Sequence, residues 1–217
     1  MPFSLKGVPS VNRFVERDAE MRQLEAFFYP TTPTPPRRKV FVIHGLGGIG
    51  KTQLAIEFAR KHHGRHSAVF WLDGSSQDRL TQSFVDIAPR LPQNELTADT
   101  VEGLRRAKVD VEAVVGGVLQ WLDLPTNKHW LLIIDNVDCD HLSKEKDPQA
   151  YDVNKYVPPA DHGSIVITTR LASLRRYGAD AKLNKVDDEQ AKAILKSNAG
   201  RPVEGELRCR HITWGWN

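Results

Sequence analysis

Residues 45–52 read GLGGIGKT, which matches the phosphate-binding pattern G-x-x-x-x-G-K-S/T at every fixed position. Glycines let backbone N–H groups converge on an anion because no Cβ stands in the way. Lys51 would reach the outer phosphates of a nucleotide, and the Thr52 hydroxyl would bind Mg²⁺. The pattern therefore predicts a nucleotide-phosphate site made by Gly45, Gly47, Gly48, Ile49, Gly50, Lys51 and Thr52.

Two carboxylates follow a second apolar run, in the stretch LLIIDNVD at residues 131–138. Asp135 emerges at the carboxyl end of the run, where it could hold Mg²⁺ opposite Thr52. Asp138 lies three residues further on and could orient or deprotonate an attacking water. An ordinary turn aspartate explains Asp138 equally well, because Asp140 and the turn context are also present.

A third apolar run, GSIVITTR at residues 163–170, ends in an arginine. An arginine at a strand tip beside the phosphate loop can contact a γ-phosphate and so distinguish ATP from ADP. Taken alone, Arg170 would be an ordinary surface charge. Its place on the sheet that carries the nucleotide favours the sensor interpretation.

The strands expected to position these residues are apolar runs separated by helical patterns. We expect strands at residues 40–44, 67–74, 129–135 and 163–170, and a weak one at 181–186. Helical patterns cover residues 16–28, 51–63, 75–91, 109–124 and 188–200, and the four prolines of 29–39 indicate an extended link. Non-alternating strands between helices predict an α/β fold with a parallel sheet, which binds ligands at the carboxyl ends of its strands.

Composition narrows the class of protein further. A chain of 217 residues with 40% hydrophobic residues can bury a core, and its length suits one large domain or one domain plus a fragment of a second. Two cysteines, no signal-peptide pattern and no apolar run of membrane-spanning length predict a cytoplasmic protein that has no membrane partner. A net charge of +3 is too mild to predict a nucleic-acid partner, although Arg37, Arg38, Lys39 and Lys51 lie in a window without acids.

The motifs, taken in order, resemble the NB-ARC domain of the STAND class of P-loop NTPases, in the style of fungal NOD-like receptors. The resemblance rests on RFVERDAEMRQLEAFF, GLGGIGKTQLA, LLIIDNVD and GSIVITTR, which together span residues 13–170. It implies a three-layer sandwich with sheet order 2-3-1-4-5. It also implies that residues 13–17 lie beside the adenine, with Val15 as the contact. Lys51 and Thr52 would hold phosphates and Mg²⁺, Asp135 the metal, and Arg170 the γ-phosphate.

Two features depart from the family pattern. Asn136 stands where many NB-ARC proteins have a second aspartate, which leaves the hydrolytic base open. The family also continues into helical and winged-helix domains, which we expect to be missing here. The expected division is an adenine-side segment and linker at 1–38, a P-loop NTPase domain at 39–199 and an atypical tail at 200–217.

The resemblance implies a signalling switch of innate immunity that binds ATP or ADP with Mg²⁺ and hydrolyses ATP slowly. Its partner would be the adenine nucleotide, with self-association or a NOD-like receptor oligomer in the ATP state. Two alternatives stay open at this point. One is a P-loop enzyme of another kind, such as a small-molecule kinase, which would need an acceptor site and an arginine-rich lid. Residues 171–180 supply Arg175 and Arg176, but their pattern indicates a surface helix. The other is an interaction module that binds nucleotide without turnover.

Overall fold

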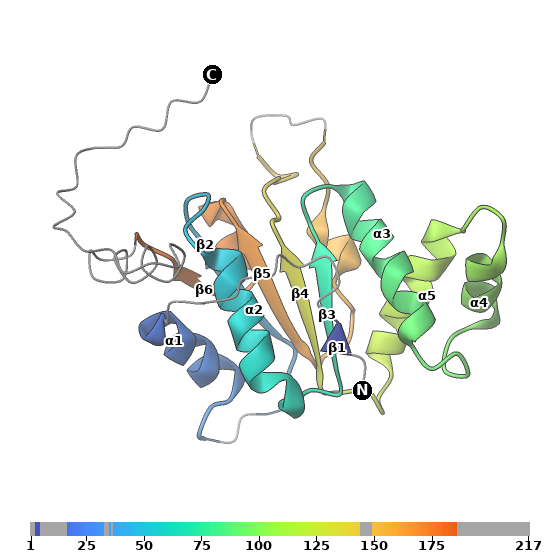
Figure 1. Cartoon of the computed structure of the whole chain (residues 1–217), viewed down its shortest axis with the longest axis horizontal. Helices are drawn as coiled ribbons and strands as arrows, with labels where there is room; N and C mark the ends of the chain where they lie inside the picture. Colours follow the sequence, from blue (N-terminus) through green and yellow to red (C-terminus); the bar gives the residue numbers. More distant parts are fainter. Residues whose placement is uncertain (1–2, 5–16, 33–34, 36, 144–148, 186–217) are drawn as a thin grey trace, which may run out of the picture.

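The computed structural model describes residues 3–4, 17–32, 35, 37–143 and 149–185. Its main elements (Figure 1) are, in chain order, β1 (Phe3–Ser4), α1 (Asp18–Phe28), β2 (Lys39–His44), α2 (Lys51–His62), β3 (Ala68–Asp73), α3 (Gln77–Ile87), α4 (Ala98–Arg105), α5 (Val111–Asp123), β4 (Trp130–Asp135), β5 (Ser164–Thr169) and β6 (Ala179–Lys182). Short 3₁₀ helices are η1 (His63–Arg65), η2 (Ala88–Arg90), η3 (Val153–Tyr156) and η4 (Ala172–Tyr177). The helix expected over 188–200 and the tail 200–217 lie outside the described residues.

The strands form one parallel sheet in the order β1-β3-β4-β5-β2-β6. This arrangement confirms the predicted α/β class, a three-layer P-loop NTPase sandwich with a parallel sheet. The predicted order 2-3-1-4-5 is wrong. Counted from β2, the order of the five long strands is 2-3-4-1-5, because β5 pairs with both β4 and β2. β2, β3, β4 and β5 are all mainly apolar runs, so their patterns do not reveal whether β2 or β5 lies next to β4.

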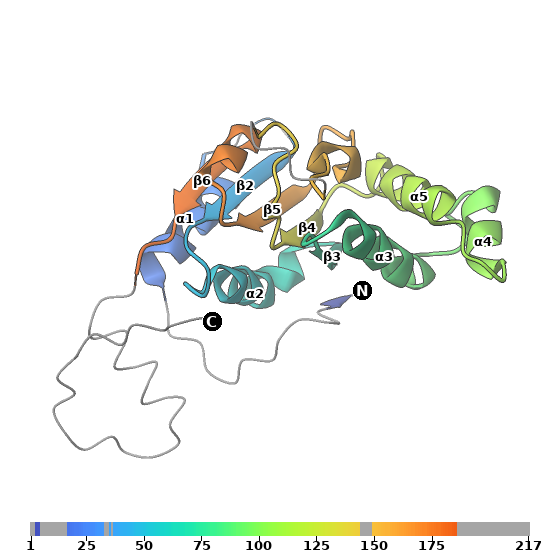
Figure 2. The ribbon, with the colours of Figure 1, turned by 90° about the horizontal axis from the view of Figure 1, so that it is seen from above.

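Successive side chains of β2, β3, β4 and β5 enter two different cores, as the two-residue repeat of a strand requires. Ile43 of β2 belongs to the core that includes Leu24 of α1 and Leu54 of α2. Val42 belongs to the opposite core, which includes Phe84 of α3 and Leu122 of α5. Figure 2 shows α2 and α5 on opposite sides of the sheet. Covering both faces explains why the strands are continuous apolar runs.

Helix α4 is the main element that the sequence patterns do not predict, because it is short and its apolar pattern is weak. Its N-cap residue Thr97 accepts a hydrogen bond from the backbone N–H of Thr100. A Cβ added at Gly117 of α5 would lie 1.9 Å from the Thr100 hydroxyl oxygen. The absence of a side chain at Gly117 therefore lets α4 pack closely against α5.

Most of the expected elements form with shifted ends. The helix expected over 75–91 is α3 followed by η2, which contains Pro89, and its N-cap is Ser76. The weak strand expected at 181–186 is β6, which begins at Ala179. None of the helices in the described ranges is long and apolar enough to cross a membrane.

Candidate functional site

The phosphate loop connects the end of β2 to the start of α2, at the carboxyl edge of the sheet. Gly45, Gly48 and Gly50 have positive φ angles of 148°, 71° and 97°, a region that side chains with a Cβ rarely adopt. A Cβ at Gly45 would also lie 2.7 Å from the carbonyl oxygen of Leu183. Glycine is therefore required at the start of the loop by close approach as well as by conformation.

Lys51 is the first residue of α2, and its side chain folds back over the loop. Its Nζ donates hydrogen bonds to the carbonyl oxygens of Gly45 and Leu46, both at 2.9 Å. The residue is only 8% exposed. Burial lowers the pKa of Lys51 below its ordinary value, and the carboxylates of Asp138 and Asp135 oppose that shift. The cation thus lies inside the loop where an anion would bind.

Two hydroxyls converge on the carboxylate of Asp135, at the end of β4. The Thr52 Oγ1 donates to Asp135 Oδ1 at 2.9 Å, and the Thr168 Oγ1 donates to the same oxygen at 2.5 Å. Thr168 also accepts a hydrogen bond from the backbone N–H of Asn136. The predicted pair Thr52 and Asp135 is therefore in direct contact, and Thr168 is a member of the site that sequence reasoning did not assign.

The strand register adds a second carboxylate, because Asp73 of β3 lies opposite Asp135. Burial raises the pKa of Asp135 above its ordinary value, against the hydrogen bonds from Thr168 and Thr52, and the charge of Asp73 adds to the increase. Burial also raises the pKa of Asp73, but hydrogen bonds from Ser75 and Arg79 outweigh it, so that pKa is lowered. A bound cation would relieve the cost of charging Asp135.

The residues present fit Mg²⁺. A hydroxyl and a carboxylate are the hard oxygen ligands that Mg²⁺ prefers, and phosphate oxygens and water usually complete its shell. Within the described residues, no cluster of three or more His, Cys, Asp or Glu side chains could hold a metal by itself. The pair formed by Thr52 and Asp135 would therefore act together with the phosphates of a nucleotide.

Arg170 lies against the phosphate loop and is held there by Asp138. A Cβ added at Gly47 would be 3.5 Å from the Arg170 guanidinium carbon. Asp138 Oδ1 accepts a hydrogen bond from the Arg170 backbone N–H at 2.7 Å, and its Oδ2 pairs with the Arg170 Nε at 2.8 Å. Both carboxylate oxygens of Asp138 are thus engaged by one arginine, whose side chain is 62% exposed.

Arg17 supports the loop and was not singled out as a site residue by the sequence patterns. It is 6% exposed and donates to the carbonyl oxygen of Ile49 at 2.8 Å and to that of Asn184 at 3.1 Å. The sequence feature that could have identified Arg17 is its position at the end of the segment 13–17, which the family resemblance places beside the adenine. The expected adenine contact, Val15, lies outside the described residues.

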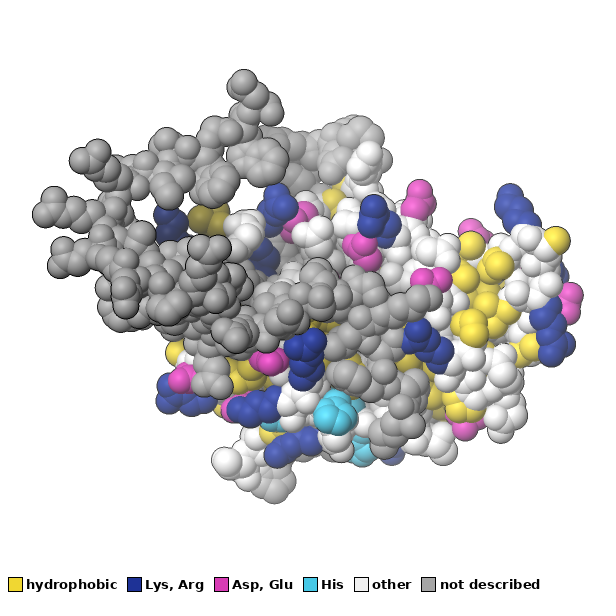
Figure 3. Space-filling model, viewed as in Figure 1, with side chains coloured by type: hydrophobic (Ala, Val, Ile, Leu, Met, Phe, Trp, Pro, Cys, Tyr) yellow, Lys and Arg dark blue, Asp and Glu magenta, His cyan; other side chains and the backbone are white. Residues whose placement is uncertain are grey.

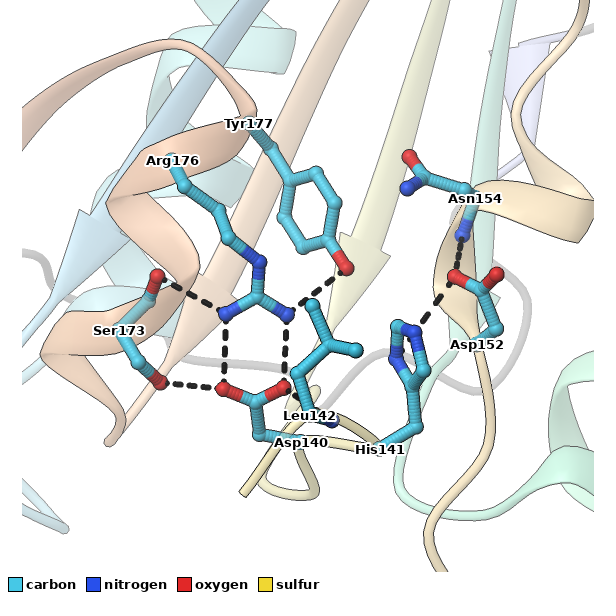
Figure 4. Close-up of polar contacts among 8 residues, drawn as sticks. All are labelled: Asp140, His141, Leu142, Asp152, Asn154, Ser173, Arg176 and Tyr177. Atoms are coloured by element: carbon cyan, nitrogen blue, oxygen red, sulfur yellow. Dashed lines mark hydrogen bonds and ion pairs between the residues drawn. The ribbon is translucent and has the colours of Figure 1, made fainter. Parts of the chain in front are cut away.

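Beyond Asp138, a bidentate ion pair ties the segment after β4 to η4 (Figure 4). The two Asp140 carboxylate oxygens accept hydrogen bonds from the Arg176 guanidinium at 2.7 and 2.6 Å, and Ser173 donates a third. These bonds, above all those from Arg176, hold the pKa of Asp140 well below its ordinary range. The ion pair therefore fixes the two segments that carry Asp138 and Arg170 relative to each other.

We expect Arg176→Met to lower the free energy of unfolding by about 1–3 kcal/mol, because Asp140, which is 8% exposed, would lose its charged partner. The matched control is Arg175→Met at the neighbouring exposed residue, which should change that free energy by less than about 0.5 kcal/mol. Urea unfolding at pH 7 measures both. Equal losses in the two variants would contradict a specific role of the ion pair.

The same ion pair predicts a dependence on pH. Because the folded-state pKa of Asp140 is below its ordinary value, its stabilisation is complete above the unfolded-state pKa of about 4 and is lost as pH falls below it. The difference in unfolding free energy between wild type and Arg176→Met should therefore shrink below about pH 4. A constant difference down to about pH 2.5 would show that the loss has another cause.

Comparison with known proteins agrees with this geometry. The profile of the AAA ATPase domain family matches residues 13–154. A nucleotide-binding leucine-rich repeat (NLR)-like protein of Hyaloscypha variabilis is 28% identical over 185 residues, which cover 82% of this chain and 18% of that protein. The chain thus spans less than a fifth of this relative.

Two solved structures share the fold. Cdc6p from Pyrobaculum aerophilum superposes with a TM-score of 0.56 at 15% identity, over 91% of this chain and 52% of that one. The Aeropyrum pernix ORC1 protein, solved in complex with DNA, gives a TM-score of 0.53 at 19% identity, over 89% and 51%.

The family match covers most of the chain and includes the phosphate loop and the strand that ends in Asp135. P-loop ATPases of this family bind nucleotides, usually with Mg²⁺. The chain belongs to the AAA ATPase domain family, which confirms the prediction of an NB-ARC-like P-loop NTPase domain of the STAND class.

Proposed function

We propose that this chain binds ATP and ADP with Mg²⁺ at residues 45–52 and acts as a switch that hydrolyses ATP slowly. The observation that carries the proposal is the direct hydrogen bond between the Thr52 hydroxyl and the Asp135 carboxylate, 2.9 Å long. This bond joins the helix that follows the phosphate loop to the end of β4, which is the arrangement that a Mg²⁺–nucleotide complex needs.

Each residue has a distinct role in this proposal. Backbone N–H groups of the loop and the start of α2 bind the phosphates, and Lys51 places its positive charge beside them. Thr52 and Asp135 hold Mg²⁺, which when bound neutralises charge on the phosphate oxygens. Thr168 orients the Asp135 carboxylate through its short hydrogen bond, and Arg17 supports the loop at the Ile49 carbonyl oxygen.

Slow hydrolysis is supported by the environment of Asp138. The sequence suggests it as a base for an attacking water, but both of its oxygens are engaged by Arg170. A carboxylate in that position is better placed to hold the arginine than to accept a proton from water. We therefore propose that Asp138 positions Arg170 beside Gly47, where the guanidinium can detect a γ-phosphate. Asn136 next to Asp135 is a neutral side chain and offers no further carboxylate.

A signalling role is supported by the similarity to an NLR-like protein. We propose that the domain works in the cytoplasm as part of a NOD-like receptor type of protein in innate immunity. Its nucleotide state would control self-association through the differential affinity of two conformations for ATP and ADP. Nucleic acid is not proposed as a partner, although one protein that shares the fold was solved in complex with DNA.

The kinase alternative receives less support from the structure. A kinase lid needs arginines that can swing onto the transferred phosphate. Arg176 instead forms a bidentate pair with Asp140. The second alternative, nucleotide binding without turnover, differs from the proposal only in the rate of hydrolysis.

Replacement of Arg170 tests the sensor role. We expect Arg170→Ala to lower the affinity for Mg²⁺–ATP about tenfold and that for Mg²⁺–ADP less than about twofold, because only ATP carries the phosphate that the guanidinium contacts. Arg175→Ala, a nearby exposed arginine, is the matched control and should change neither. Competition against a fluorescent ADP analogue measures both affinities. Equal losses for ATP and ADP would contradict a γ-phosphate sensor.

Asp138→Ala separates the two roles considered for that residue. If Asp138 holds Arg170, its removal should also reduce the preference for ATP over ADP, since the guanidinium loses its anchor. If Asp138 is the hydrolytic base, the variant should keep that preference and lose turnover alone. The same competition assay, combined with a hydrolysis rate, distinguishes the two outcomes.

A further inference from the structure

A cavity lies at the opposite edge of the sheet from the phosphate loop. Its volume is about 550 Å³, within the range of small-molecule sites. It lies where the parallel strands begin, so the six residues of β2 separate it from the loop by roughly 20 Å. Its lining residues are Phe28, Tyr29, Pro35, Arg37, Lys39, Arg65, His66, Lys128, His129, His162, Gly163 and Ser164.

The lining carries a charge of one sign. Arg37, Lys39, Arg65 and Lys128 are cationic, and the described residues that line the cavity include no Asp or Glu. Figure 3 shows Lys, Arg and His side chains together at this end of the molecule, below the C-terminal end of α2. A concave surface lined by cations focuses the electric field and concentrates small anions. The cavity is therefore suited to an anionic ligand.

One cation of the cavity is held in place by the protein. The Lys39 Nζ donates to the carbonyl oxygen of Phe28 at 2.7 Å, which fixes the ammonium at the cavity wall. An ammonium has three protons, so further donors are available for a ligand. Burial lowers the pKa of Lys39, and an anion in contact with it would offset that cost.

Two other side chains of the lining, His66 and Tyr29, make hydrogen bonds within the protein and are not needed to bind a ligand. The His66 Nδ1 lies 3.2 Å from the His129 carbonyl oxygen and its Nε2 lies 2.8 Å from the Tyr29 hydroxyl, so the ring donates to the first and accepts from the second. Burial lowers the pKa of His66 to about 4, which keeps the ring neutral at pH 7. The positive charge that attracts an anion therefore comes from Arg37, Lys39, Arg65 and Lys128.

We propose that this cavity binds a small molecule that carries several phosphate groups, at a site separate from the phosphate loop. Flexible Lys and Arg side chains around a concave surface can surround a compact polyanion and donate to several of its oxygens. The Arg65 guanidinium lies 4.5 Å above the centre of the Tyr29 ring. Because that ring face is covered, it offers no platform for stacking the bases of a single-stranded nucleic acid.

The test uses the full chain with Lys51→Ala, so that the phosphate loop contributes little and the result does not depend on nucleotide binding there. The probe is inorganic tripolyphosphate, titrated calorimetrically at about 0.1 M salt, where weak surface attraction is screened. We expect Arg65→Ala with Lys128→Ala to lower its affinity about tenfold or more. The matched control pair, Arg105→Ala with Lys155→Ala, removes two exposed cations outside the lining and should change affinity less than about twofold.

Three results would overturn the proposal. The first is that tripolyphosphate does not bind at about 1 mM, and the second is an equal loss in both double variants, which would indicate unspecific attraction to a basic protein. The third is that a single strand of about 20 nucleotides binds more tightly than tripolyphosphate and is weakened by both pairs, which would indicate a nucleic-acid surface. Circular dichroism confirms folding, which we expect to persist because Arg65 and Lys128 are exposed.

Discussion

Replacement of Lys51 by alanine is expected to lower the affinity of the chain for ATP and ADP at least tenfold, about 1.4 kcal/mol or more. Lys51 is the cation inside the phosphate loop, and it also links the carbonyl oxygens of Gly45 and Leu46. Its removal therefore takes away both the charge beside the phosphates and a constraint on the loop. Isothermal titration calorimetry with Mg²⁺–ATP and Mg²⁺–ADP measures the effect.

The matched control for Lys51 is Arg60→Ala, which removes one exposed cation from the same helix. Its affinity for both nucleotides should stay within about twofold of wild type, since long-range attraction between exposed charges is screened. Unchanged affinity in Lys51→Ala would show that the nucleotide binds elsewhere or does not bind.

Replacement of Asp135 by asparagine is expected to abolish the gain in ATP affinity that Mg²⁺ provides and to lower ATP turnover about a hundredfold or more. The amide keeps an oxygen that can accept from Thr52 and Thr168, so the shape of the site is preserved while the charge that holds the cation is removed. ATP titrations with Mg²⁺ and with EDTA, together with a hydrolysis assay, measure the two effects.

Thermal unfolding separates this loss from misfolding. The folded-state pKa of Asp135 is raised, so this residue favours folding in its neutral form and that contribution is lost as pH rises through the folded-state pKa. Because the amide is neutral at every pH, Asp135→Asn should be at least as stable as wild type at pH 7. Asp123→Asn, at an exposed carboxylate, is the matched control. Retained Mg²⁺ dependence in Asp135→Asn would contradict the metal-ligand role.

Local patterns were sufficient to predict most of the elements. The apolar runs ending at His44, Asp135 and Thr169 form β2, β4 and β5, because strands buried on both faces read as continuous hydrophobic segments. The order of these strands could not be predicted in the same way. It depends on which runs pair across long sequence separations, and near-identical apolar runs carry no label for their neighbours.

The phosphate loop at residues 45–52 and Asp135, the partner of Thr52, were predictable because each comes directly after an apolar strand. The contact between Asp138 and Arg170 was not predictable, since only the folded chain brings together these two residues, which are 32 positions apart in the sequence. Thr168 and Asp73 were missed for a related reason. Thr168 donates a hydrogen bond to Asp135 from β5, and Asp73 lies opposite Asp135 on β3. Both relations depend on how neighbouring strands pair, which no local pattern reveals.

The most direct test of a slow nucleotide switch is single-turnover hydrolysis, with the full chain in excess over labelled ATP, Mg²⁺ present and no acceptor molecule. We expect complete conversion to ADP and inorganic phosphate with a rate constant on the order of 10⁻⁴ to 10⁻² s⁻¹, the range of intrinsic P-loop switches, and no conversion in Asp135→Asn. Bound ATP that stays intact for hours, or conversion faster than about 1 s⁻¹, would contradict a slow switch.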